Sequence, residues 1–210
     1  MKSSLIRPAL ALALAAGLSA CGGSDKAEFT VAGTITGIVY EGMVLKTNGM
    51  ELRVSPPAKA GDSVRFAFPN KLEYGDVYNV EIASEPAHQD CGVPSDIIPN
   101  FNDTAGRLAE INVTFACNLE THKLSGTITG QTADGLVLAN GSNTGTLTVG
   151  KPANTTPVAY DMPAVAYGTS YSVSVIKQPT GQVCTVANAT GVMGDNDITN
   201  VNVTCVAAPT

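Results

Sequence analysis

The sequence predicts an all-β protein made of two similar domains in tandem, and three observations lead to this fold class. The segment Gly-Thr-Ile-Thr-Gly occurs at 33–37 and again at 126–130. Each copy opens a block that closes on a cysteine, Cys117 in the first block and Cys205 in the second. Within both blocks apolar and polar side chains alternate, and no long helical period with caps is found. A repeat of this length suits a small β-sandwich domain and is too long for a solenoid unit.

The repeat extends well beyond its opening segment. Residues 42–45 match 135–138, and residues 75–80 match 168–173 at the same offset. The last strand matches at a different offset, because the first copy is five residues longer before it. Three single positions of the first copy also match the second: Pro86, Gln89 and Cys91 pair with Pro179, Gln182 and Cys184.

The first twenty residues have the composition of an export signal. Lys2 and Arg7 give a basic start, and an apolar run from Pro8 to Gly17 follows that is too short to span a bilayer stably. The next residues, Leu18-Ser19-Ala20-Cys21, resemble the lipobox of bacterial lipoproteins. The resemblance implies cleavage of residues 1–20, acylation of Cys21 (with palmitate among the acyl chains) and a tether over 21–28. The residue after the cysteine is Gly22 and not the aspartate that favours retention in the inner membrane. We therefore expect delivery to the outer membrane, and both leaflets remain possible locations.

The charge of the chain excludes one class of partner. Removal of residues 1–20, which hold two basic side chains and no acid, leaves 10 basic and 18 acidic side chains, a net charge of −8. Nucleic-acid binding depends on Lys and Arg that neutralise phosphates, so we expect no nucleic-acid partner. The same charge argues against adsorption to anionic lipid, and the expected membrane contact is the lipid on Cys21.

Four cysteines remain after Cys21, and an even number in an exported protein indicates disulfides. Each copy of the repeat carries its own pair, which selects Cys91–Cys117 and Cys184–Cys205 among the three possible pairings. Zinc is the competing interpretation, but no two cysteines have the two- to four-residue spacing of zinc sites.

The elements follow in order from residue 29. Alternation predicts strands over 31–39 and 78–82, and closing strands over 111–117 and 200–205. A tight hairpin is expected to join 42–47 to 50–54 at Asn48-Gly49. The glycines at 33 and 37 suggest a bulge or a close approach of the opposite sheet. The first domain is expected to cover 29–117 and the second 122–205. A linker over 118–121 and a tail over 206–210 complete the chain.

The repeated segments resemble the modules of proteobacterial surface proteins and lipoproteins. The segments that carry the resemblance are Gly-Thr-Ile-Thr-Gly, Gly-Leu-Val-Leu, Tyr-Ser-Val-Ser-Val, and the stretches that end at Cys184 and Cys205. Those modules are immunoglobulin-like (Ig-like) β-sandwiches, often in tandem and mostly without a defined ligand. The resemblance implies two tandem Ig-like β-sandwich domains, and it says little about function.

Candidate site residues are few. His88 and Asp90 could serve acid–base chemistry, although no nucleophile accompanies them, and His122 is expected in an exposed linker. The acidic segments 96–103 and 194–197 offer the oxygens that calcium prefers, but turns prefer the same residues, and both interpretations stay open. The inter-cysteine loop 92–110 is longer than its counterpart and holds Ile97, Ile98 and Phe101. These apolar residues form either a partner-binding patch or a cover for the sandwich edge.

These observations predict a membrane-anchored, non-catalytic lipoprotein of the cell envelope that requires no cofactor. It would act as a surface or periplasmic structural, adhesive or partner-binding module. One alternative is an accessory subunit of an envelope assembly that docks through loop 92–110. The other is a hydrolase that works from the His88/Asp90 loop.

Overall fold

The structure is a computed structural model that describes residues 26–141, 145–153 and 157–209, and these residues form strands and turns without a helix. The all-β class predicted from the sequence is therefore confirmed. None of the described residues belongs to a helix that could cross a membrane. The predicted signal segment 1–20 and the predicted lipidation site Cys21 lie outside the described residues.

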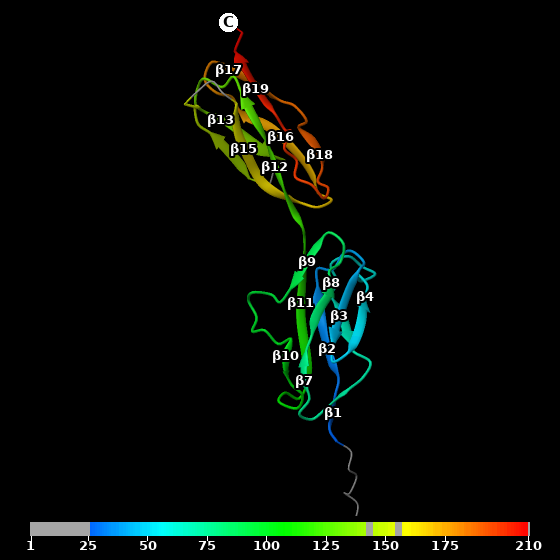
Figure 1. The fold of residues 1–210 in the computed structure, drawn as a ribbon. Coiled ribbons are helices and arrows are strands. Elements are labelled where there is room, and N and C mark those ends of the chain that lie inside the picture. Colours follow the sequence, from blue (N-terminus) through cyan, green and yellow to red (C-terminus); the bar gives the residue numbers. More distant parts are fainter. Residues whose placement is uncertain (1–25, 142–144, 154–156, 210) are drawn as a thin grey trace, which may run out of the picture.

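The N-terminal half, defined here as residues 26–119, contains two main sheets (Figure 1). One has the strand order β5-β2-β11-β9 and the other β4-β3-β8, while β7 pairs with β10 and β1 pairs with β6. The strands are β1 (Glu28–Phe29), β2 (Val31–Thr36), β3 (Met43–Thr47), β4 (Met50–Val54), β5 (Val64–Ala67), β6 (Leu72–Glu73), β7 (Val77–Asn79), β8 (Glu81–Ser84), β9 (Gln89–Gly92), β10 (Asn102–Thr104) and β11 (Ile111–Leu119).

The C-terminal half, defined as residues 121–207, has the sheet orders β15-β12-β19-β17 and β14-β13-β16-β18. Its strands are β12 (Thr121–Thr129), β13 (Leu136–Asn140), β14 (Thr146–Val149), β15 (Val158–Ala166), β16 (Ser170–Lys177), β17 (Gln182–Val186), β18 (Thr190–Val192) and β19 (Val203–Ala207). Strand for strand this is the order of the N-terminal half, with β7 and β8 together in the place of β16 and β10 in the place of β18.

Each half has a separate apolar core to which both of its sheets contribute. In the N-terminal half Val31 and Ile35 of β2 meet Met43 and Leu45 of β3, and all four are buried. The corresponding residues of the C-terminal half are Leu124 and Ile128 of β12 with Leu136 and Leu138 of β13. The alternation predicted for 111–117 is confirmed, because Ile111, Val113, Phe115 and Cys117 are all buried.

The cysteines pair within each half, as the repeat leads us to expect. Cys91 on β9 faces Cys117 on β11, and Cys184 on β17 faces Cys205 on β19, each with a Cα–Cα distance of 4.0 Å. The hairpin prediction is also confirmed, since Asn48 and Gly49 both have positive φ between β3 and β4.

The glycines of the repeated segment mark a close approach within one sheet, and the alternative of an approach by the opposite sheet is wrong. A Cβ on Gly33 would lie 2.1 Å from the carbonyl oxygen of Val113 on β11 and 2.5 Å from the ring of Phe66 on β5. Gly126 is similarly placed against Val201 and Tyr160. The aromatic ring of the neighbouring strand takes the space that a side chain at the glycine would need.

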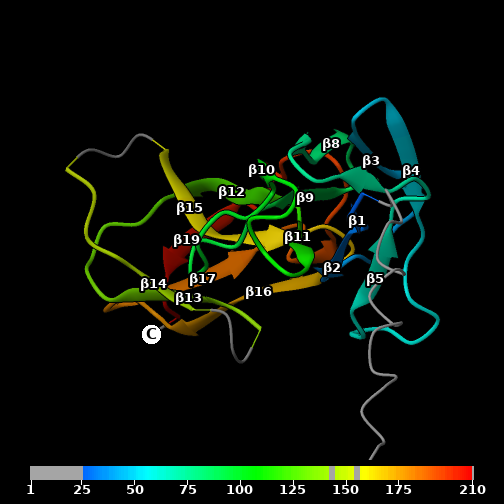
Figure 2. The same cartoon turned by 90° about the horizontal axis from the view of Figure 1, so that it is seen from below.

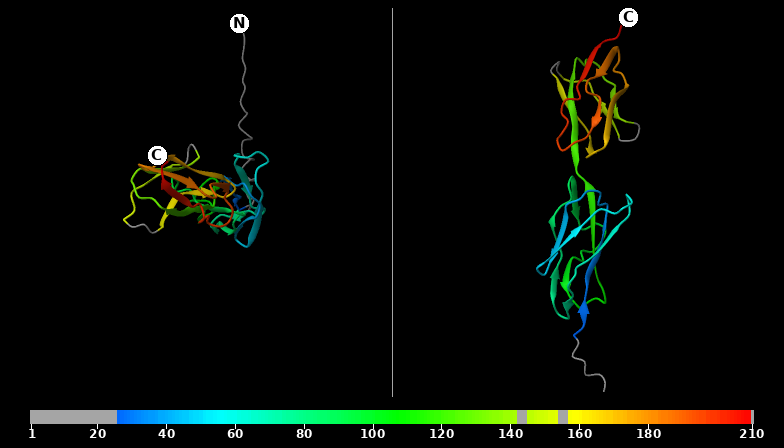
Figure 3. Two further views of the ribbon diagram at one scale, coloured as in Figure 1. Left: turned by 90° about the horizontal axis from the view of Figure 1, so that it is seen from above. Right: turned by 90° about the vertical axis from the view of Figure 1, so that its right-hand side faces the viewer.

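The two halves are joined end to end by an almost continuous strand (Figure 1). β11 ends at Leu119 and β12 begins at Thr121, so Glu120 alone lies between them. The segment 118–121, which we expected to be a linker, is therefore mostly strand. Viewed from below (Figure 2) and from above (Figure 3, left), the C-terminal half is offset to one side of the N-terminal half, whereas in the side view (Figure 3, right) the two halves stand roughly in line. The N-terminal strand β1 lies at the end farthest from the C-terminal half (Figure 1).

Candidate functional site

A buried glutamine in each half holds the turn that follows the repeated glycine segment. The Gln89 Oε1 atom accepts hydrogen bonds from the backbone N–H of Val39 and Tyr40, and its Nε2 donates to the carbonyl of Gly37. Gln182 makes the same three bonds, to Thr132, Ala133 and Gly130. These glutamines match in the repeat, but their role was missed because a matched polar residue in sequence does not reveal its partners. In the N-terminal half the turn carries Tyr40 to the end that meets the C-terminal half.

Glu120, the residue between the two halves, forms a backbone hydrogen bond with each of them. The N–H of Glu120 donates to the carbonyl of His88 at 3.0 Å, and its carbonyl accepts the N–H of Tyr167 at 2.9 Å. His88 belongs to the turn before β9, and Tyr167 follows β15. One residue thus links a loop of each half, which restricts rotation at the crossing.

Side chains of both halves complete this contact, which we call the joint and define as Tyr40, His88, Tyr167 and Asp195. The rings of His88 and Tyr167 are stacked, with centroids 3.7 Å apart and planes inclined by 6°. Tyr40 packs edge-on against both rings, at 5.4 Å from His88 and 5.9 Å from Tyr167. The Nδ1 atom of His88 lies 2.6 Å from the Oδ1 atom of Asp195. His88 is 28 % exposed and so lies at the rim of the joint.

The backbone at His88 is unusual for a residue with a side chain. Its φ is +57°, in the left-handed region, whereas the matching residue of the C-terminal half is Gly181 with φ +71°. Glycine adopts this conformation without steric cost, and a side chain raises the energy by about 1–2 kcal/mol. The N-terminal half therefore keeps an imidazole at a position where the scaffold suits glycine.

The carboxylate that the structure places against the imidazole of His88 is that of Asp195 in the other half, and not that of Asp90 beside it in the sequence. The prediction of an exposed His122 is wrong. His122 lies in β12 with its side chain 17 % exposed, its Nδ1 is 3.9 Å from Asp197 Oδ1, and its Nε2 is buried without a hydrogen-bond partner. Both histidines thus face the segment 194–197, and the contact of His88 with Asp195 spans the two copies and has no signature in either one.

The acidic segment 194–197 has structural partners for both of its carboxylates. Asp195 meets His88, and the Oδ1 atom of Asp197 accepts the backbone N–H of Lys123 at 2.8 Å. Across the described residues, no group of three or more His, Cys, Asp or Glu side chains is arranged to hold a metal ion.

The three apolar residues predicted as a patch in loop 92–110 differ in how far they are buried. Phe101 packs against the N-terminal core, and its carbonyl accepts the N–H of Val80 at 2.7 Å. Ile97 is half-buried in a turn, whereas Ile98 is 89 % exposed. The loop also contains β10, which pairs with β7. The sequence thus places the apolar residues in this loop, but it does not separate the exposed one from those that cover the sheet.

Glu85 and its counterpart Gln178 bind the backbone of a disulfide cysteine in different ways. Its Oε2 atom accepts the N–H of Cys91 at 3.1 Å. Gln178 in the C-terminal half makes two such bonds, accepting from the N–H of Cys184 and donating to its carbonyl. Burial raises the pKa of the Glu85 carboxyl, Asp90 raises it further, and the bond from Cys91 opposes the rise.

Two hollows lie on the N-terminal half, and the joint borders neither of them. One, of about 480 Å³, lies over β2 and β5 and is lined by residues that include Phe66, Arg65 and Glu110. The other, of about 420 Å³, lies beside the Asn48-Gly49 hairpin and Val77.

Comparisons with family models, with curated proteins and with solved structures found no match to this chain.

Proposed function

We propose that the protein is a membrane-anchored, non-catalytic lipoprotein of the cell envelope that works as a rigid two-domain spacer. The observation that carries this proposal is the joint, in which side chains and backbone of both halves fix one end-to-end arrangement. A rigid rod anchored at one end holds its other end at a defined distance from the membrane. The N-terminal end lies opposite the C-terminal half, in keeping with an anchor at Cys21 (Figure 1).

The proposed domains are two tandem Ig-like β-sandwiches over 29–117 and 122–205. This assignment is supported by the identical strand orders, by the separate cores and by one disulfide in each half. The signal segment 1–20, acylation of Cys21 and outer-membrane location form part of the same proposal, and they derive from the lipobox resemblance alone.

The non-catalytic role is favoured over a hydrolase by the surroundings of His88. A general base must reach a proton of the substrate or nucleophile through its free nitrogen. The contact of His88 Nδ1 with Asp195 leaves Nε2 free, as in a Ser-His-Asp triad, so this contact alone does not argue against a base. The argument rests on packing, because one face of the ring is stacked on Tyr167 and Tyr40 meets the ring edge-on. The imidazole thereby serves packing between the halves.

The anchor is tested by replacing Cys21 in the bacterial cell. We expect wild-type protein to incorporate labelled palmitate and to fractionate with outer membranes. The Cys21→Ser variant should lose the label and be released from the membrane fraction. Unlabelled wild-type protein that is soluble after cell breakage would contradict the proposal.

A second candidate function, docking of an envelope partner through loop 92–110, is favoured by one observation. Ile98 is 89 % exposed in a loop whose neighbour Phe101 packs on the core. A photo-crosslinking residue at position 98 should therefore capture one defined neighbour in intact cells. The matched control is position 176, where Ile176 is also exposed but lies on β16 of the other half. Equal crosslinking from both positions, or none from position 98, would exclude this function.

A further inference from the structure

The end of the N-terminal half that carries β1 exposes several large apolar side chains. Tyr74 is 70 % exposed, Val77 is 68 % exposed and Leu108 is 55 % exposed. Three of the exposed large apolar residues of the described chain thus lie in two neighbouring segments, 74–77 and 105–108. On most of the surface of a folded protein, exposed large apolar residues are scattered singly and do not form groups.

Backbone contacts hold these segments against the start of the described chain. The N–H of Tyr74 donates to the carbonyl of Ala27, and the N–H of Gly75 donates to the carbonyl of Ala105. The ring of Tyr74 lies over Gly106, where an added Cβ would come within 2.3 Å of it. Val77 pairs with Thr104 between β7 and β10. The exposed apolar residues therefore surround the point at which the chain leaves for Cys21.

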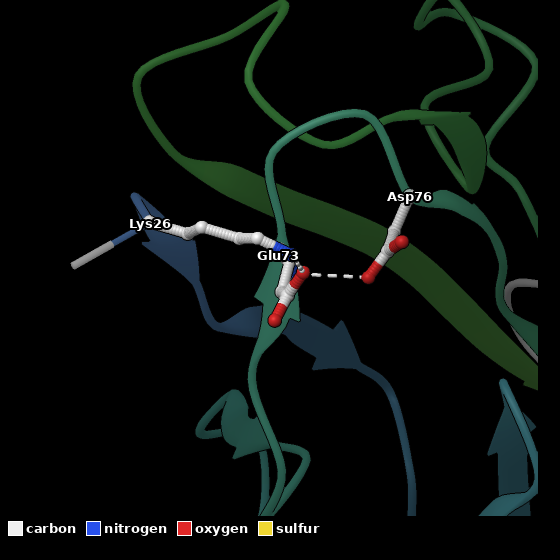
Figure 4. A network of polar contacts seen from close by, with 3 residues as sticks. All are labelled: Lys26, Glu73 and Asp76. Carbon is white, nitrogen blue, oxygen red and sulfur yellow. Dashed lines mark hydrogen bonds and ion pairs between the residues drawn. The ribbon is translucent and has the colours of Figure 1, made fainter. Parts of the chain in front are cut away.

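The basic side chains at this end are all paired with acidic ones, and Asp76 adds one further acidic group. Lys26 pairs with Glu73, Lys71 with Glu28, and Arg107 with Asp103. Figure 4 shows Lys26 reaching Glu73, whose backbone N–H in turn donates to Asp76. Each basic group of these pairs has an acidic partner at the surface, so the end carries no strong field of either sign.

Chain length places this end next to the membrane. Lys26 is the fifth residue after Cys21, and five fully extended residue steps span at most about 18 Å. With Cys21 acylated, β1 and its neighbours would thus lie within reach of the lipid headgroups. Tyrosine and basic side chains are enriched at this depth, because the aromatic ring is apolar and its hydroxyl remains hydrated.

We propose that this end of the N-terminal half docks on the phospholipid surface, with Tyr74 and Leu108 entering the headgroup region. This inference rests on the proposed anchor, since apolar contacts of this size hold a protein at a membrane only when another signal recruits it. Docking at this end would fix the angle between the long axis of the protein and the membrane. A lipid anchor on a short tether does not fix that angle.

The chain contains no tryptophan, so a single introduced tryptophan reports on its own surroundings. We would use the chain from Cys21 onward, which keeps every residue that the structure describes. Cys21 is its one thiol outside the two disulfides, and it can be coupled to a maleimide lipid in phosphatidylcholine vesicles. The Tyr74→Trp variant should then shift its emission to shorter wavelength and be quenched by nitroxide-labelled headgroups. Val206→Trp, exposed on β19 of the other half, should show neither change.

The Leu108→Trp variant repeats the test at a position that does not pack on Gly106, in case Tyr74→Trp disturbs the fold. Unchanged emission from both variants on coupled vesicles would overturn the docking, as would a shift that requires anionic lipid. Because coupling replaces natural acylation, this result is independent of the Cys21→Ser experiment. Unlabelled Cys21 in cells would refute the anchor even if the coupled protein docks, and labelled Cys21 with unchanged emission would refute docking alone.

Discussion

The two halves of the molecule have corresponding strand orders, and four of the differences between them are instructive. Shared features include the glycines of the repeated segment and the buried glutamines Gln89 and Gln182. The aromatic residue beside the glycine is Phe66 in one half and Tyr160 in the other. The residue that hydrogen-bonds the disulfide cysteine is Glu85 or Gln178, and His88 takes the place of Gly181. The longer loop 92–110 is the fourth difference. The shared features hold each sandwich-like core. The joint uses His88, whose counterpart is Gly181, and Tyr167, whose counterpart Tyr74 lies at the other end of the N-terminal half.

The first way to break the comparison is to add a methyl group at the repeated glycine. Gly33→Ala and Gly126→Ala should each destabilise the protein by about 3 kcal/mol or more, because the added Cβ would collide with a backbone carbonyl of the neighbouring strand. Urea unfolding of each variant measures the loss. Truncating the ring in Gly33→Ala/Phe66→Leu should not restore stability, since the carbonyl of Val113 remains in place.

Each half offers its own control for this experiment. Gly92 and Gly194 have nothing within 4 Å of an added Cβ and lack a left-handed φ. Gly92→Ala and Gly194→Ala should therefore change the free energy of unfolding by less than about 1 kcal/mol. If Gly33→Ala and Gly92→Ala unfold at the same urea concentration, the close approach does not govern the choice of glycine.

The fold was largely predictable from the sequence because its determinants repeat. Alternation located the closing strands, and the second copy of the cysteines removed the ambiguity of their pairing. Phe66 and Tyr160 also match in register, but their place over the glycines depends on strand neighbours far apart in the chain. Such a contact follows from the sheet order, which periodicity alone does not supply.

The second comparison concerns these rings. The hydroxyl of Tyr160 donates to the carbonyl of Val201 at 2.6 Å, and burial raises the pKa of Tyr160 to about 12, whereas Phe66 has no hydroxyl. An unfolded tyrosine loses its proton near pH 10, while the folded one retains it. The free energy of unfolding should therefore fall by about 1–3 kcal/mol more as pH rises from about 10 to about 12 in wild type than in Tyr160→Phe.

Phe66→Tyr in the Tyr160→Phe background is the reciprocal test. The carbonyl of Val113 lies beside Gly33 as that of Val201 lies beside Gly126, so the new hydroxyl should find an acceptor and restore the alkaline loss of stability. Parallel pH profiles for wild type and Tyr160→Phe would show that the buried hydroxyl does not titrate differently in the folded state.

The third comparison is between Glu85 and Gln178. Because burial raises the pKa of Glu85, the folded state binds a proton more tightly than the unfolded state, and stability falls as pH rises above the ordinary glutamate pKa. Glu85→Gln removes this loss and supplies a donor for the carbonyl of Cys91, as Gln178 does for Cys184. Because Glu85 is exposed and water screens its charge, we expect a gain of no more than about 1 kcal/mol at pH 7 by calorimetry.

The gain at Glu85 should shrink at acidic pH, where the wild-type carboxyl is protonated. The control is Gln178→Glu, which should lose stability at pH 7 and recover part of it in acid. Equal stability of Glu85→Gln and wild type at pH 7 would mean that the glutamate is solvated well enough to make the exchange neutral.

The site was less predictable than the fold for a physical reason. Residue type and spacing led to a pairing of His88 with Asp90, because a sequence reveals neighbours along the chain. The partner Asp195 lies over a hundred residues away and belongs to the other copy. An interface between repeats is the one feature that matching the repeats cannot reveal. The glycine-to-histidine exchange at 88 was the available signal.

The smallest effect is expected at the joint, where orientation rather than stability should change. Asp195→Ala removes the partner of His88 at a surface that is mostly exposed, so the free energy of unfolding should change by less than about 1 kcal/mol. The relative orientation of the halves, measured from residual dipolar couplings, should become more variable. His88→Gly should do the same more strongly, because it also removes the ring stacked on Tyr167 while relieving the left-handed backbone. Asp90→Ala is the matched control beside the same histidine and should keep the wild-type orientation. If Asp195→Ala and His88→Gly keep it as well, the side chains of the joint do not fix the arrangement, and the proposed rigid spacer is wrong if the wild-type protein itself samples many orientations.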